Sequence, residues 1–202
     1  IAYAQLGFYN NAIENINKSL EIKTNNSKSL SLLCEYLFQI NSIEELTVKL
    51  ASINEKQIES IEDKNRILRV KIRLHALNNE LESIDFLQKS ITVDSTNVED
   101  YIENQRLFAE ILSVKGDNND AIKSIQNTLR HIDLKPNHTL ILSLKNDLIR
   151  YLNKTGQYDE SLIINENIIS QLKLILGDRH PSLGSSLNQL STTYRLKGDL
   201  ES

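Results

Sequence analysis

A basic segment in the first half of the chain holds the side chains with the clearest potential for chemistry. Between residues 64 and 75 it carries Lys64, Arg66, Arg69, Lys71, Arg73 and His75. On a helix, Arg66, Arg69 and Arg73 share one face, because residues three and four apart are neighbours there. Three guanidinium groups on one face could bind an acidic peptide or a phosphate, so this trio is a candidate anion-binding site. The alternative is a solvated face that pairs with the acidic residues between 59 and 63.

No residues with catalytic or metal-binding spacing accompany this segment. The four histidines lack zinc-type spacing, and His131 and His138 lie seven residues apart with no further ligand nearby. No nucleophile–base pair, phosphate-binding loop or dinucleotide fingerprint is found. The chain is therefore predicted not to be an enzyme and to hold no cofactor and no metal. Cys34 falls on an apolar stripe, where a buried sulfur is expected.

The composition favours a folded protein without a general affinity for nucleic acid or membranes. The 202 residues are 40% hydrophobic and 25% charged, with two prolines and a formal net charge of −4. No apolar run approaches the ~20 residues of a membrane-spanning helix, and no signal peptide is visible. A single cysteine favours a reducing setting, so a cytoplasmic protein is expected. Because the chain has no initiator methionine and begins and ends within expected helices, we interpret it as a piece of a longer protein.

Turn signals recur along the chain and indicate helical repeats. The expected turn positions are separated by 34 to 42 residues and are Gly7, Asn41, Asn78, Gly116, Gly156 and Gly198. Between them the apolar residues follow helical spacing, as in the stripes Leu30–Leu37 and Leu187–Tyr194. No stretch alternates with the period of a strand. Each unit is thus predicted to be a helix, a tight turn and a second helix.

Such helix pairs bury their apolar faces by stacking, which predicts an all-α, right-handed α-solenoid of antiparallel helix pairs. Ala109 and Ala121 are expected at the close contact between the paired helices around Gly116. The chain is predicted to be one array, with repeats at 1–24, 25–60, 61–96, 97–136, 137–181 and, truncated, 182–202. Its severed repeat ends could also support self-association.

These residues resemble the tetratricopeptide repeat family. Leu187, Leu190–Ser191, Tyr194 and Gly198 match the family's pattern in the last copy, and Tyr3, Gly7–Tyr9 and Ala12 match it in the first. In the C-terminal part, Gly156–Ser161, Leu176–Pro181 and Ser186–Leu190 resemble the 42-residue repeat of the kinesin light chain type, whose connector includes His180. The second and third copies depart from the pattern at Asn41, Leu46, Lys71 and Asn78–Glu80, so they should be less regular.

The resemblance implies a function, because tetratricopeptide arrays generally bind a peptide or partner protein on the concave face formed by the first helix of each pair. The residues expected there are Asn146, Asp147, Arg150, Asn188, Gln189, Thr192 and Arg195. Amide side chains offer both a donor and an acceptor to a peptide backbone. The alternative is a wet face of an asparagine-rich chain that binds nothing.

Two functions from different classes follow. The favoured one is a non-catalytic scaffold that binds a peptide or partner protein. The other is the sensory or regulatory arm of a larger signalling enzyme or transcription regulator, whose effector domain would lie outside these residues. A self-assembling array is a third, weaker hypothesis.

Overall fold

The structure is a computed structural model that describes residues 8–24, 26–93, 97–135, 138–178 and 181–198. All regular secondary structure in these ranges is helical, which confirms the all-α prediction for the described residues. The chain divides into two compact units, Ile1–Ser95 (unit 1) and Thr96–Ser202 (unit 2). The division falls one residue from an expected repeat boundary, and the single array across both units stays a prediction. Tyr3, Gly7 and His180 lie outside the described residues.

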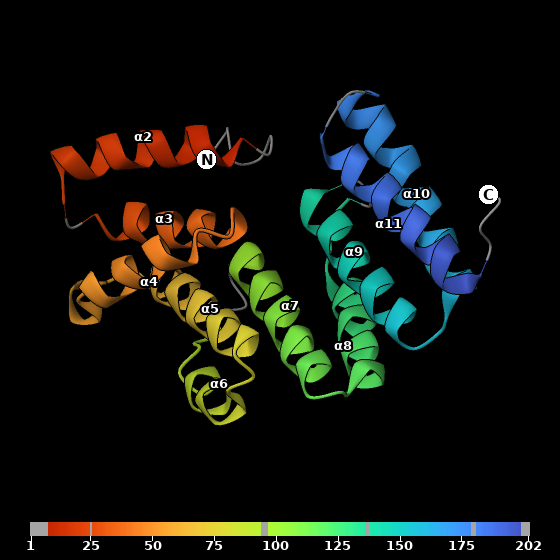
Figure 1. Cartoon of the computed structure of the whole chain (residues 1–202), viewed down its shortest axis with the longest axis horizontal. Helices are drawn as coiled ribbons and strands as arrows, with labels where there is room; N and C mark the ends of the chain where they lie inside the picture. The colour runs from red at the N-terminus through yellow and green to blue at the C-terminus, as the bar shows by residue number, and fades with distance from the viewer. Residues whose placement is uncertain (1–7, 25, 94–96, 136–137, 179–180, 199–202) are drawn as a thin grey trace. The chain divides into compact units, whose positions relative to one another are not determined.

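Unit 1 consists of α2 (Tyr9–Ile22), α3 (Ser27–Gln39), α4 (Ile43–Ser52), the short 3₁₀ helix η1 (Glu55–Gln57), α5 (Ile61–Leu77) and α6 (Leu81–Gln88). Helix α3 packs against α2, α4 and α5, and α6 packs against α5 (Figure 1). The second helices α4 and α6 have only 10 and 8 residues, against 14 and 19 for their counterparts in unit 2. They are the two shortest α-helices among the described residues, and the irregularity of the second and third copies stays a prediction.

Unit 2 consists of α7 (Val98–Val114), α8 (Asn118–His131), α9 (Thr139–Lys154), α10 (Tyr158–Leu176) and α11 (Pro181–Lys197). Each helix packs against the next, and α9 also contacts both α7 and α11. Figure 1 shows α7 with α8, and α9 with α10, as pairs joined by short turns. The first helices α7, α9 and α11 thus lie next to one another in chain order.

Left-handed residues end the first helix of each described pair. Their backbone φ angles are positive at Asn41, Asn79, Gly116, Gly156 and Gly198. In the first four turns the next residue donates its backbone N–H to the carbonyl oxygen five residues earlier, at 2.9 Å. The positive φ angles confirm four of the expected turn positions: Asn41, Gly116, Gly156 and Gly198. Asn78 instead has a φ of −90°, and Asn79 takes the left-handed conformation. The difference arises because α5 continues to Leu77 and Asn78 is its C-cap.

The core of unit 1 lies between α2, α3, α4 and α5. It contains Leu33, Cys34, Leu37, Leu46 and Val70. Cys34 is fully buried, as expected. Burial raises the pKa of its thiol to about 11.

Unit 2 has one buried cluster across α7, α8 and α9 and a second across α9, α10 and α11. Ala109 on α7 and Ala121 on α8 are fully buried in the same cluster, which confirms their expected place between the paired helices. In α11 the expected stripe differs, because Leu187 and Ser191 are exposed. Helix α11 instead turns Thr193 inward, where its hydroxyl contacts Asn153 at 2.8 Å and Ser161 at 3.4 Å. The spacing of apolar residues thus predicted the helix α11 correctly, but it did not predict which face of α11 packs against α10.

None of the described helices is both long enough and apolar enough to cross a membrane.

Candidate functional site

The first helices of unit 2 carry polar residues at equivalent positions. Counting back ten residues from the left-handed glycine of each turn gives Arg106 on α7, Asn146 on α9 and Asn188 on α11. Counting back six gives Glu110, Arg150 and Thr192. We call these six residues the first-helix strip. Arg106 and Glu110 were missed from sequence, although the same count from Gly116 would have found them.

Asp147 joins two of these helices. Its carboxylate accepts a hydrogen bond from Arg106 Nε of α7 at 2.6 Å and one from Arg150 of its own helix at 3.0 Å. Arg106 also pairs with Glu103 at 2.7 Å. Burial alone would lower the pKa of Arg106, but the carboxylates of Glu103 and Asp147 outweigh it and raise that pKa. Asp147 therefore joins α7 to α9, and its side chain is only 10% exposed.

Arg150 is the cation of the strip that is most open to a ligand. Its side chain is 49% exposed, and its guanidinium carbon lies 5.1 Å from the centre of the Tyr151 ring. It donates hydrogen bonds to Asp147 and, at 3.2 Å, to the Tyr151 hydroxyl. Burial raises the pKa of Tyr151 to about 12, so this hydroxyl stays neutral at ordinary pH. Arg150 is thus held in one orientation while part of its guanidinium faces solvent.

Asn146 and Gln189 meet between α9 and α11. Gln189 Nε2 donates to the backbone carbonyl of Asn146 at 3.1 Å. The side-chain oxygen of Asn146 is buried and has no hydrogen-bond partner among the described residues. A buried acceptor of this kind costs free energy until a donor reaches it. The same holds for the side-chain oxygens of Asn153 and Gln171.

The remaining predicted residues lie along one face of α11. Asn188 and Arg195 are exposed, and Thr192 is partly buried and donates its hydroxyl to the Asn188 carbonyl at 2.9 Å. Because the three residues are four and three apart, they share that face. The structure therefore brings Asn146 together with Gln189 and Asp147 together with Arg150, and places Asn188, Thr192 and Arg195 in line beside them.

The basic segment of unit 1 lies on α5 and packs against α3. Arg66 and Arg69 are buried, so this face of α5 is not solvated. Arg66 pairs with Glu35 of α3 at 3.1 Å and with Glu62 and Asp63 at 2.6 and 3.0 Å. Of the alternative interpretation, the pairing of Arg66 with Glu62 and Asp63 is confirmed, whereas solvation is wrong for Arg66 and Arg69 because their helix packs against α3.

Hydroxyl groups of α3 complete this network. Asp63 accepts hydrogen bonds from Ser27 at 2.9 Å and from Ser31 at 2.8 Å, and Arg66 also donates to Ser31 at 2.9 Å. The charge of Arg66 is therefore already matched inside unit 1. Anion binding by Arg66, Arg69 and Arg73 stays a prediction, with Arg73 the partly exposed member of the trio.

Within the described ranges, no group of three or more His, Cys, Asp or Glu side chains could hold a metal ion.

Comparison with known proteins gives partial sequence matches and matches among solved structures. No protein-family model matches the chain. A segment of 65 residues is 35% identical to the RxLR effector protein SFI4 of Phytophthora infestans (strain T30-4) and covers 32% of this chain and 19% of that protein. A segment of 58 residues is 40% identical to the secreted RxLR effector protein RXLR-C07 of Plasmopara halstedii and covers 29% of this chain and 18% of that protein. The matches thus span less than a fifth of either relative.

The structural match concerns the fold alone. The crystal structure of BtubC (BKLC) from P. vanneervenii aligns with a TM-score of 0.50 over 98% of this chain and 85% of that chain, at 12% sequence identity. Together with the all-helical elements and their neighbour packing, it is compatible with a helical repeat protein.

Proposed function

We propose that the protein is a non-catalytic interaction module that binds a peptide or partner protein across α7, α9 and α11. The proposal includes a tetratricopeptide-like right-handed solenoid within each unit, of the kinesin light chain type in the C-terminal part. One observation carries it: three consecutive first helices have polar residues at the same positions relative to their left-handed turns.

The dimensions of the strip suit an extended peptide. Packed helices lie about 8–10 Å apart, and an extended chain advances about 3.3 Å per residue. Neighbouring first helices would therefore contact peptide residues about three apart. The amides of Asn146 and Asn188 would bond the peptide backbone, whereas Arg150 would bind an acidic side chain or a terminal carboxylate.

A reducing cellular compartment is part of the proposal, because the lone Cys34 is buried and free. One of the two curated relatives is named as secreted, so location should be measured directly.

Substitution within the strip tests the proposal. An array of synthetic peptides with acidic residues at varied positions is screened with the native protein, and the affinity of each captured peptide is measured by fluorescence anisotropy. The double variant Asn146→Ala with Asn188→Ala should weaken binding by about 1–3 kcal/mol, because two peptide hydrogen bonds are lost.

Asn119→Ala with Asn127→Ala provides the matched control. Both asparagines are exposed on α8, the second helix of its pair, and circular dichroism checks that each double variant keeps its helices. An array without any captured peptide, or equal loss of affinity in both double variants, would contradict the proposal.

A further inference from the structure

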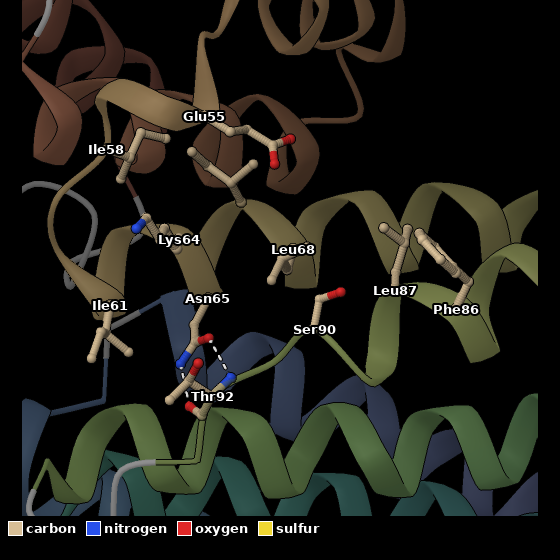
Figure 2. Close-up of a pocket in the computed structure, with 11 residues that line it drawn as sticks. Glu55, Ile58, Ile61, Lys64, Asn65, Leu68, Phe86, Leu87, Ser90 and Thr92 are labelled. Carbon is tan, nitrogen blue, oxygen red and sulfur yellow. Dashed lines mark hydrogen bonds between the residues drawn. The ribbon is translucent and has the colours of Figure 1, made fainter.

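Unit 1 has a hollow of about 300 Å³ bordered by α5, α6 and the chain segments beside them (Figure 2). Its apolar lining comes from Ile58, Ile61, Ile67, Leu68, Phe86 and Leu87. Phe86 is 72% exposed although it is a large aromatic residue. Exposed apolar side chains gathered around a hollow are typical of a binding surface.

The polar groups in this hollow are largely satisfied within the protein. Figure 2 shows the Asn65 side chain bonded to both backbone groups of Thr92: its Nδ2 donates to the carbonyl at 2.7 Å, and its Oδ1 accepts from the N–H at 3.0 Å. Glu55 is paired with Lys71. An occupant therefore gains mainly by burying apolar surface.

A second hollow of about 340 Å³ borders the same two residues of α6. It is lined by Phe86 and Leu87 together with His75, Glu82 and Ser83. Two hollows that share a wall can each hold one of two neighbouring side chains of a polypeptide, whereas a single small compound would fill only one of them. The occupant that this geometry favours is a peptide segment.

Each hollow has one exposed charged side chain outside the ion pairs of the described residues, and the two charges differ in sign. His75 at the second hollow is paired with Glu80 at 2.5 Å. Lys64 at the first hollow and Glu82 at the second are both exposed, and neither has an ion pair within the described part of the chain. A peptide that fits both hollows should carry an acidic residue toward Lys64 and a basic residue toward Glu82.

We propose that this surface, the α5–α6 groove, binds a short peptide segment in which large apolar residues lie between an acidic end and a basic end. In this arrangement one apolar side chain of the peptide lies in each hollow, with Phe86 and Leu87 between them. Lys64 and Glu82 fix the direction of the peptide. The groove belongs to unit 1 and is independent of the first-helix strip of unit 2.

Tryptophan fluorescence tests this site directly, because the chain contains no tryptophan. Phe86→Trp places a single indole at the wall between the hollows, and Phe8→Trp places one at another exposed position of unit 1. The probe is acetyl-Asp-Glu-Leu-Ala-Leu-Lys-Lys-amide. We expect a saturable blue shift of emission with Phe86→Trp and none with Phe8→Trp. The peptide with both leucines replaced by serine should bind at least about tenfold more weakly.

Charge reversal tests the predicted direction. In the Phe86→Trp background, Lys64→Glu should reverse the preference for this probe over acetyl-Lys-Lys-Leu-Ala-Leu-Lys-Lys-amide. Lys23→Glu makes the same charge change at an exposed residue after α2 and should leave the preference intact.

Equal binding of the probe and of acetyl-Lys-Lys-Leu-Ala-Leu-Lys-Lys-amide by the Phe86→Trp protein would overturn the proposal. An emission shift with the fatty acid octanoate, but with neither peptide, would overturn it as well. If Phe86→Trp fails to keep its helices by circular dichroism, anisotropy of the fluorescein-labelled probe with the native chain gives the same comparison.

Discussion

The carboxylate of Asp147 lies between two guanidinium groups, Arg106 from α7 and Arg150 from its own helix. This contact joins the helices beneath the first-helix strip. It also holds Arg150 over Tyr151, where half of the Arg150 side chain faces solvent. The same carboxylate therefore joins α7 to α9 and orients Arg150.

Asp147→Asn should lower the free energy of unfolding by about 2–3 kcal/mol. It removes one of the two carboxylate charges that pair with Arg106, while Glu103 stays in place. The cost stays below the ~3–5 kcal/mol of breaking a fully buried pair, because Glu103 remains and the Arg106 side chain is 23% exposed. Urea denaturation measures the change. The control is Glu14→Gln, which breaks the exposed pair with Lys18 on α2 and should have a much smaller effect. Equal effects would show that Asp147 does not join α7 to α9.

Cys34 predicts a pH dependence for unit 1. Burial raises its thiol pKa from 9.0 to about 11, so the folded state holds the proton more tightly than the unfolded state. The resulting stabilisation is complete below pH 9 and is lost as pH rises from about 9 to 11, by about 2–3 kcal/mol. Cys34→Ala should lower stability at every pH but show a smaller decline over this range. Parallel curves for the two proteins would rule out the thiol as the source.

At the scale of the elements, the left-handed turns set the register of the helices. Gly156 has a φ of 75°, and a Cβ built on it meets no atom within 4 Å. Any cost of a larger residue there is therefore conformational. Gly184 lies inside α11 without a positive φ and also has open space around it.

Gly156→Ala should destabilise the protein by about 1 kcal/mol, because alanine is strained in the left-handed region. Gly184→Ala should instead stabilise it by up to about 1 kcal/mol, since alanine favours a helix interior. Thermal or urea unfolding of both variants gives the two signs. A stabilising Gly156→Ala would mean that this residue does not end α9 in the left-handed conformation.

Turn signals and helical periodicity predicted most of the elements. The count from turn to turn identified the helix pairs, because a left-handed helix end strongly favours Gly or Asn. It could not choose between Asn78 and Asn79, since both side chains tolerate that conformation. It also could not show that α10 covers the Thr193 side of α11 and leaves Leu187 exposed, because that depends on packing between helices.

The candidate site was predicted in part for a related reason. Asn146, Arg150, Asn188 and Thr192 follow from position in the repeat, whereas Arg106 and Glu110 needed the same count from Gly116. The burial of Arg66 and Arg69 could not be derived from spacing. A helix face of arginines has the same sequence pattern whether it meets solvent or, as Arg66 does, the carboxylate of Glu35 on a neighbouring helix.

At the scale of the whole molecule, the same position in the repeat differs in burial between the two units. Ten residues before the left-handed turn, unit 1 has the buried Ser31 and Arg69, whereas unit 2 has the partly buried Arg106 and Asn146 and the exposed Asn188. In unit 1, Ser31 of α3 forms hydrogen bonds with Asp63 and Arg66 of α5. In unit 2, Arg106 likewise bonds Asp147 between α7 and α9, so we expect Asn146 and Asn188 of this row to bind a partner.

The most direct test of this claim is nuclear magnetic resonance of the nitrogen-15-labelled chain during titration with a peptide captured on the array. We predict that the side-chain amide signals of Asn146, Asn188 and Gln189 shift and saturate together, while those of Asn119 and Asn127 on α8 stay in place. Shifts confined to α8 and α10, or to unit 1, would contradict peptide binding by the first helices of unit 2.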